Sequence, residues 1–249
     1  MILSIEIRNL REASKLNIKD GIVLDGFPSA GLLNAIASEC LIRSSGTELF
    51  AVIDSPEFPP LSIISNSMPH FPARLHINEA LKVAFFISEF NIDPHMQSAM
   101  GKKILDWARQ NGCRLIISAA GILATTQDKG DNASVIPEEQ RIFAVTSTPS
   151  AAKIAKANNF IQLQSGTIGG IPATLLNEGS LLGLDVIVLL VKTMPDVPDF
   201  RASALISSAV TKLVPGLYCD IKSLLGEAET VENKIKQIRD GHKESSYIT

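Results

Sequence analysis

Residues 93–121, DPHMQSAMGKKILDWARQNGCRLIISAAG, predict one helix followed directly by one strand. Asp93 is a favourable N-cap, and Pro94 suits the first helical position because its missing backbone N–H needs no partner there. Asn111-Gly112 ends the helix, and Leu115–Ile117 is a short apolar strand. The apolar face of the helix consists of Met96, Met100, Ile104 and Trp107.

The rest of the chain repeats this alternation of helices and strands. Strands are expected at Leu3–Ile7, Ile22–Leu24, Leu49–Ile53, Leu61–Ile64, Arg74–Ile77, Val83–Ile87, Ile142–Thr146, Phe160–Leu163 and Asp185–Val191. Helices are expected at Ala30–Ile42, Ser150–Ala157 and Pro172–Leu182, and from Asp199 to Pro215-Gly216. The clustered strands between residues 49 and 87 favour some antiparallel pairing. We therefore expect an α/β three-layer sandwich with a mixed, largely parallel sheet.

A heptad pattern distinguishes the C-terminal segment. Apolar side chains follow one another at spacings of three and four residues, as in a coiled-coil seam. The seam consists of Ile221, Leu224, Ala228, Val231, Ile235 and Ile238, with Leu225 beside it. Its partner is either the chain's own domain or another subunit. We expect a core domain at residues 1–217, a C-terminal helix at 218–241 that packs on the core or on a partner subunit, and a flexible tail at 242–249.

Composition excludes several classes of protein. The chain has 249 residues, 45% of them hydrophobic and 20% charged, with a net charge of −3. This balance is typical of a soluble globular protein and argues against a nucleic-acid-binding surface. The longest apolar run, Val186–Val191, is too short to span a membrane, and Glu6 and Arg8 interrupt any export signal. Cys40, Cys113 and Cys219 form no CxxC pair, so we expect no disulfide framework, no zinc site and a cytoplasmic location.

Three glycine-containing turns follow predicted strands. The first contains Gly26, Phe27, Pro28 and Gly31, the second contains Gly121, and the third contains Gly166, Gly169 and Gly170. They either allow helices to approach the sheet closely or line a cleft at the carboxyl ends of the strands. Leu32 and Leu33 stand where a P-loop has its lysine and hydroxyl, so a nucleotide-binding interpretation of the first turn fails.

No complete catalytic or metal-binding set is visible in the sequence. His70 and His76 lie near Glu79 without the spacing of a metal site, and no carboxylates can be paired as acid and base. Arg201 is the only basic residue near an expected strand-end cleft, and we expect it to pair with a carboxylate. We therefore predict no catalytic residues, no cofactor and no metal.

The ordered set of glycine motifs resembles the proteasome assembly chaperone family, specifically its second-subunit type and its single-chain archaeal relatives. The resemblance runs from about residue 20 to about residue 215. Its motifs are Gly26-Phe-Pro28 to Gly31-Leu32, Pro59-Pro60, Ile104-Leu-Asp-Trp107, Gly112 to Ile117 with Gly121-Ile122, Gly166 to Gly170, and Pro198-Asp-Phe-Arg-Ala202.

This resemblance implies a non-enzymatic cytoplasmic protein that self-associates and binds the α-subunits of the proteasome. It also implies an architecture similar to that of nucleoside phosphorylases, with a C-terminal helical arm. Relatives often dock through a chain end that reads hydrophobic–tyrosine–any residue. Here the end is Tyr247, Ile248 and Thr249, so the tyrosine stands one residue too early.

Two other functions remain open from the residues alone. One is a phosphorylase- or hydrolase-like enzyme that acts on a nucleoside or a similar small molecule in the strand-end cleft. The other is a structural oligomer whose C-terminal arm serves only self-assembly.

Overall fold

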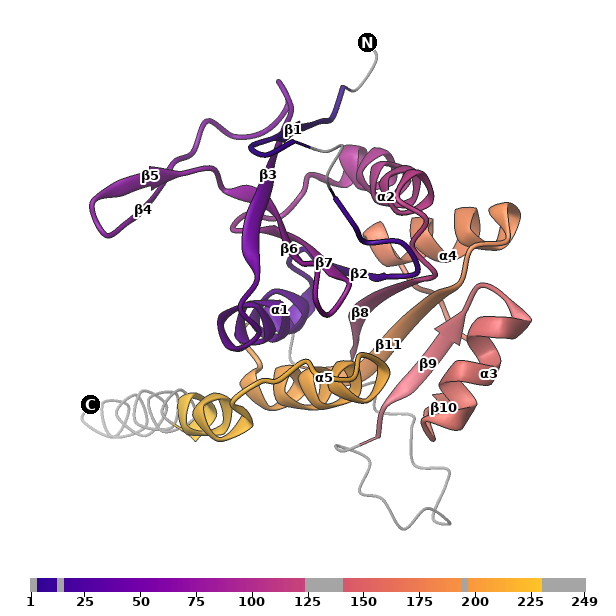
Figure 1. The fold of residues 1–249 in the computed structure, drawn as a ribbon. Coiled ribbons are helices and arrows are strands. Elements are labelled where there is room, and N and C mark those ends of the chain that lie inside the picture. Colours follow the sequence, from indigo (N-terminus) through magenta and orange to yellow (C-terminus); the bar gives the residue numbers. More distant parts are fainter. Residues whose placement is uncertain (1–3, 13–15, 124–140, 194–196, 230–249) are drawn as a thin grey trace, which may run out of the picture.

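The computed structural model describes residues 4–12, 16–123, 141–193 and 197–229. Its main sheet has nine strands: β1 (Glu6–Asn9), β2 (Ile22–Gly26), β3 (Glu48–Asp54), β6 (Ala73–Asn78), β7 (Val83–Ser88), β8 (Leu115–Leu123), β9 (Phe143–Thr146), β10 (Ile161–Gln162) and β11 (Val186–Thr193). Their order across the sheet is β1-β3-β6-β7-β2-β8-β11-β9-β10 (Figure 1).

The sheet is parallel at its centre and mixed at its margins. Strands β7, β2, β8 and β11 run parallel to their neighbours in this group. On one side β6, β3 and β1 pair in antiparallel fashion, and on the other side β9 pairs antiparallel with β11. The expected mixed sheet is confirmed, but parallel pairing is limited to the four central strands and to the edge pair β9–β10.

Five α-helices lie wholly within the described residues: α1 (Leu33–Ser44), α2 (Pro94–Gln110), α3 (Pro149–Ala157), α4 (Gly170–Leu182) and α5 (Phe200–Leu213), with a short 3-10 turn at Ala30–Leu32 before α1. A further helix begins at residue 221. The two N-caps expected from the sequence are present. The Asp93 carboxylate accepts the backbone N–H of His95 at 3.2 Å, and the Asp199 carboxylate accepts that of Ala202 at 2.9 Å.

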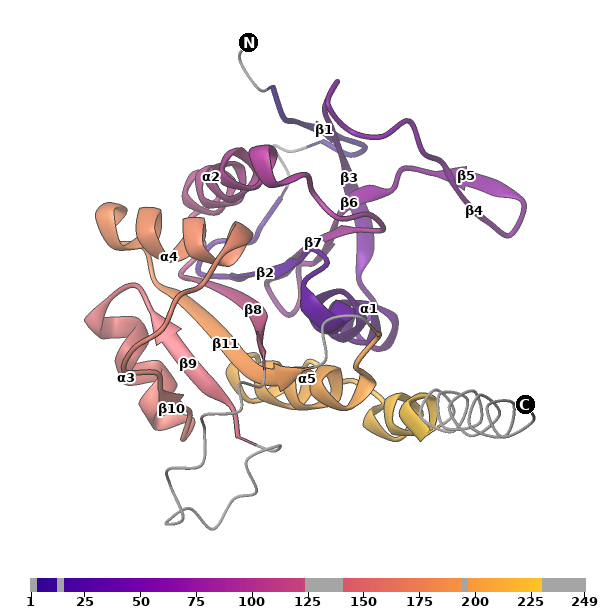
Figure 2. The same cartoon turned by 180° about the vertical axis from the view of Figure 1, so that it is seen from behind.

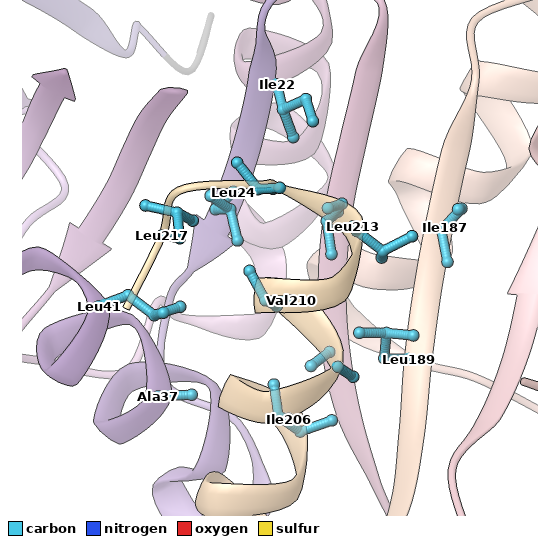
Figure 3. Close-up of a cluster of buried hydrophobic side chains, with 14 of the residues drawn as sticks. Ile22, Leu24, Ala37, Leu41, Ile187, Leu189, Ile206, Val210, Leu213 and Leu217 are labelled. Carbon is cyan, nitrogen blue, oxygen red and sulfur yellow. The ribbon is translucent and has the colours of Figure 1, made fainter. Parts of the chain in front are cut away.

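Both faces of the central strands are buried. On β2, Ile22 and Leu24 pack in the cluster that contains α1 and α5, whereas Val23 packs in the cluster that contains α2 and α4. Figure 3 shows the first of these clusters, with side chains of α5 meeting those of α1, β2 and β11. Helices therefore cover the two faces of the sheet, as the alternation of elements predicts.

A small hairpin projects from the body after β3. It consists of β4 (Ile63–Ser65) and β5 (Met68–His70), which pair only with each other among the described strands (Figure 1). Asn66 and Ser67 form its tip with φ angles of 50° and 62°, the conformation of a tight two-residue hairpin turn. The expected strand at Leu61–Ile64 is thus shifted along the chain and shortened.

The beginning of the C-terminal seam packs on its own chain. Residues 221–229 are helical, and Leu224 and Ala228 are buried. Ile221 and Leu225 are partly buried against the α1–α5 cluster. The seam positions Val231, Ile235 and Ile238 lie outside the described residues, so this observation concerns only the first part of the arm.

A disulfide joins Cys40 on α1 to Cys219, which follows α5. The expectation of unpaired cysteines is therefore wrong for these two residues. The cysteines consequently no longer support a reducing compartment. Residue spacing gave no warning, because the two cysteines are 179 residues apart and meet only when α1 and α5 pack on the same face. Within the described residues, no helix is both long and apolar enough to cross a membrane.

The disulfide generates a prediction about stability. Removing it by Cys40→Ser is expected to lower the free energy of unfolding by about 2–5 kcal/mol, because a long loop of the unfolded chain is no longer closed. The urea midpoint measures this effect. A reducing agent should lower the midpoint of the wild-type protein to a similar extent and should leave that of Cys40→Ser unchanged. An unchanged midpoint for the reduced wild-type protein would contradict the cross-link.

Candidate functional site

At the carboxyl ends of the central strands, connections leave the sheet toward opposite faces. After β2 it enters α1 on one face of the sheet, and after the adjacent β7 it enters α2 on the other face (Figure 2). Connections that part in this way leave a crevice beyond the strand ends, where open α/β sheets bind their ligands.

A cavity of about 800 Å³ occupies this crevice. Four segments line it: residues 25–34 at the end of β2, residues 91–97 at the start of α2, residues 119–122 of β8, and residues 163–172 before and within α4, joined by Leu190 of β11. Its volume is in the range of small-molecule sites.

The first turn is held in place from both of its ends. Asn34 donates its side-chain N–H to the carbonyl of Phe27 at 3.3 Å, and the backbone N–H of Asp199 donates to the carbonyl of Gly31 at 2.8 Å. Gly31 and Leu32 have φ angles of 67° and 52°, so a leucine adopts the left-handed conformation here. Such a backbone persists only where its surroundings fix it.

Asp25 stands at the end of β2 and lines the cavity. Its carboxylate accepts the Ser118 hydroxyl at 2.7 Å and the backbone N–H of Phe27 at 3.1 Å. Burial nevertheless raises the pKa of Asp25 to about 6, because desolvation of the charge outweighs these two hydrogen bonds. Asp25 is the only ionisable residue among the described residues that line the cavity.

The third turn places backbone groups at the opposite wall. Gly169 is the N-cap of α4 and offers no side chain to the first helical N–H groups. Gly166 and Gly170 have φ angles of 153° and 76°, which favour glycine. The Gln97 amide lies next to Gly170, since a Cβ there would be 3.3 Å from Gln97 Oε1.

The glycines of these turns differ in whether a side chain would fit at their positions. A Cβ at Gly26 would lie 2.5 Å from Ser38 Oγ, and one at Gly121 would lie 2.1 Å from Thr193 Cγ2. These two allow close packing, which the sequence analysis considered as one of two explanations. A Cβ at Gly169 would meet nothing within 4 Å, and the φ angle of −112° is ordinary. Packing therefore does not explain Gly169.

The structure brings most of the sequence-predicted cleft residues together. Phe27, Pro28, Gly31, Gly121, Gly166, Gly169 and Gly170 all line the cavity. Gly26 and Arg201 do not line it. Arg201 is exposed at the start of α5 and has an interaction partner, so the expected cation of the cleft is missing from the lining residues.

The histidines do not form a metal site in the described part of the chain. No group of three or more His, Cys, Asp or Glu side chains is placed there to hold a metal ion. The ring nitrogens of His76 are buried without a hydrogen-bond partner, and desolvation together with nearby Arg74 lowers the pKa of His76 to about 4. Tyr247, Ile248 and Thr249 lie outside the described residues.

A second surface was missed by the sequence analysis. The β4–β5 hairpin and its flanks expose Leu61, Ile64, Met68 and Phe71, with 45–66% of each side chain accessible. Residues 58–73 contain no Asp, Glu, Lys or Arg. This absence of charge over sixteen consecutive residues was the available signal.

The sequence matches a known protein family over most of its length. Residues 23–239 match the PAC2 family, which is most of the chain. The chain belongs to the PAC2 family. The resemblance noted from the glycine motifs is thereby confirmed. An uncharacterized protein of Methanocaldococcus jannaschii is 26% identical to this PAC2 protein over 232 residues, covering 93% of this chain and 90% of the relative.

Solved structures from Pyrococcus furiosus share the PAC2 fold of this chain. PbaA, an archaeal homolog of proteasome-assembly chaperone, matches with a TM-score of 0.80 and 24% identity, covering 98% of this chain and 94% of PbaA. PbaB, an archaeal proteasome activator, matches with a TM-score of 0.77 and 22% identity, covering 96% of this chain and 100% of PbaB.

Asp25 gives a prediction about pH dependence. Because its pKa is raised from 3.8 to about 6 on folding, the native state holds this proton more tightly than the unfolded state. Its contribution to stability is therefore present below pH 4 and is lost as the pH rises through 6. Relative to the wild type, Asp25→Asn should gain about 2 kcal/mol in free energy of unfolding between pH 4 and pH 7.

Urea unfolding at the two pH values measures this change. Asp106→Asn, which replaces an exposed carboxylate on α2, is the matched control and should show no such gain. A constant difference between Asp25→Asn and the wild type across this range would contradict the assignment.

Proposed function

We propose that this PAC2 protein is a non-enzymatic proteasome assembly chaperone that self-associates and binds proteasome α-subunits in the cytoplasm. The match to the PAC2 family over residues 23–239 carries the proposal. Further support comes from the similarity of fold to PbaA and PbaB, which are related to proteasome assembly and activation. The phosphorylase-like alternative has less support, because Arg201 does not line the cavity that such a reaction would use.

The hairpin supports a role in binding another protein. A two-stranded hairpin is only marginally stable in water by itself, and its exposed Ile64 and Met68 gain by leaving water. We propose that it contacts a second copy of this chain. Its lack of charge suits an obligate contact, because obligate interfaces are more hydrophobic than transient ones and their cores are depleted in charged residues.

A complementary apolar surface lies at the other end of the molecule. There α4 ends in Leu181 and Leu182, which are 81% and 46% exposed, and the edge strand β10 exposes Ile161. Figures 1 and 2 show the hairpin and the α3–α4 end at opposite edges of the sheet. Two different patches at opposite ends favour a head-to-tail arrangement, which closes into a ring when the rotation between subunits allows it.

The C-terminal segment is the proposed contact with α-subunits. Leu224 and Ala228 fix the beginning of the arm on the core, and Cys219 is bonded to Cys40. We propose that residues 1–217 are the core domain, that the arm at 218–241 extends from this anchor, and that the tail at 242–249 with Tyr247 is available to a partner. The family's architecture, similar to that of nucleoside phosphorylases, belongs to the same proposal.

Binding to α-subunits is tested by truncation. A chain that ends at residue 241 keeps the buried Leu224 and Ala228 and the whole heptad seam, so it should keep its thermal midpoint and its oligomer mass. It should lose retention on immobilised purified α-subunits by at least tenfold relative to the full chain. Failure of the full chain to bind at both low and physiological salt would refute the proposed function.

Self-association is tested on the hairpin. Ile64→Asp together with Met68→Asp should reduce the mass measured by light scattering to that of the monomer, because two charges would be buried at the contact. The matched control, Ser62→Asp with Ser65→Asp, adds the same charge to the same hairpin and should retain the oligomer. An unchanged mass for the apolar double variant would remove the hairpin from the interface.

A further inference from the structure

The cavity at the strand ends has features that binding of α-subunits does not require. It gathers polar side chains from three separate segments of the chain: Asp25 and Asn34 from the β2–α1 region, Asn91 and Gln97 near the start of α2, and Ser165 and Thr167 before α4. Convergence of this kind in a cavity of about 800 Å³ is characteristic of a small-molecule site rather than of a protein contact.

Ser29 supplies an independent observation. Its hydroxyl oxygen is buried and makes no hydrogen bond, although the residue lines the cavity. A buried hydroxyl without a partner costs about 1–3 kcal/mol, so native proteins seldom keep one without a use. Leu32, three residues further on, holds its left-handed backbone in the same turn. A turn of the Ser29 side chain toward the cavity would let its hydroxyl pair with a ligand oxygen.

The lining also restricts the charge of a ligand. Among the described residues it contains no Lys, Arg or His, and the one ionisable side chain there is that of Asp25. A phosphate or carboxylate group would enter without a cation and would face a carboxylate. Hydroxyl groups suit this site better, because they donate to carboxylate and amide oxygens and accept from Ser29 and from backbone N–H groups.

The apolar part of the lining fits the other side of such a molecule. Phe27, Pro28, Ile92, Leu163, Ile168 and Leu190 contribute to the walls. A ring with one apolar face and several hydroxyl groups would use both kinds of surface, as is usual where a few polar groups orient a ligand within an apolar pocket.

We propose that this cavity binds a small, uncharged, polyhydroxylated molecule of about the size of a nucleoside or hexose. The site is formed by the turn at residues 27–32, the start of α2 and the glycine turn before α4. Its occupation does not depend on the proposed contact with the proteasome, because the hairpin and the described part of the C-terminal arm contribute no residue to it.

The test uses the full chain and saturation-transfer NMR with a defined mixture. The mixture contains adenosine, uridine, glucose and ribose together with the monophosphate of each, every compound at about 1 mM, a concentration at which weak ligands with millimolar dissociation constants are half-bound. We expect transfer to at least one neutral compound and at least tenfold weaker binding of its monophosphate. Absence of transfer to all four neutral compounds, or tighter binding of the phosphates, would overturn the proposal.

Two variants locate the binding. Gly169→Leu introduces a side chain into open space beside the cavity on an unstrained backbone and should weaken binding at least tenfold. Ser29→Ala removes one hydrogen-bonding group and should weaken it several-fold. Ser180→Leu adds similar bulk at an exposed position near the other end of α4 and should bind like the wild type. Equal binding by all three variants would place the ligand elsewhere and refute the site.

Discussion

Burial of both faces of the four parallel central strands is the constraint from which the rest of the molecule follows. Val23, Ala84, Val188 and Leu190 face one layer of helices, while Leu24, Phe85, Ile187 and Leu189 face the other. Because both layers must be covered, the chain that leaves β2 goes to one side and the chain that leaves β7 goes to the other. The cavity lies where these two connections separate, so its position is a consequence of topology rather than of any single motif.

The same constraint explains why the glycines are not equivalent. At Gly26, where α1 approaches the sheet, a methyl group would collide with Ser38, and at Gly121 it would collide with Thr193 of the neighbouring strand β11. Where the chain has already separated from the sheet, as at Gly169, there is room for a side chain. In the sequence all three positions look alike, since each is a small residue near the end of a strand. Only the distances from an added Cβ to neighbouring side chains distinguish a glycine needed for packing from one that leaves a cavity open.

Sequence reasoning succeeded where the signal was local. Asp93 and Asp199 marked helix starts because N-capping depends on neighbouring residues, and β7 and β8 were visible as apolar runs. It failed where distant segments meet. The Cys40–Cys219 disulfide forms only because α1 and α5 share a face of the sheet, which no local pattern reveals, and the β4–β5 hairpin is too short to show a period. The heptad seam showed that the C-terminal helix needs an apolar partner, but periodicity carries no information about which partner.

The hairpin surface and the cavity share an unusual lack of charge. One fifth of the chain is Asp, Glu, Lys or Arg, yet residues 58–73 have none and the described part of the cavity lining has only Asp25. A surface without charge has no long-range field to attract a partner, so it gains affinity mainly by removing apolar groups from water after contact. At the hairpin this favours a permanent neighbour over a transient one. In the cavity the same absence of charge acts as a filter, because an ion would lose its hydration without obtaining an opposite charge in return. The proposed protein contact and the proposed small-molecule site thus lie in separate parts of the described structure, although both rely on desolvation.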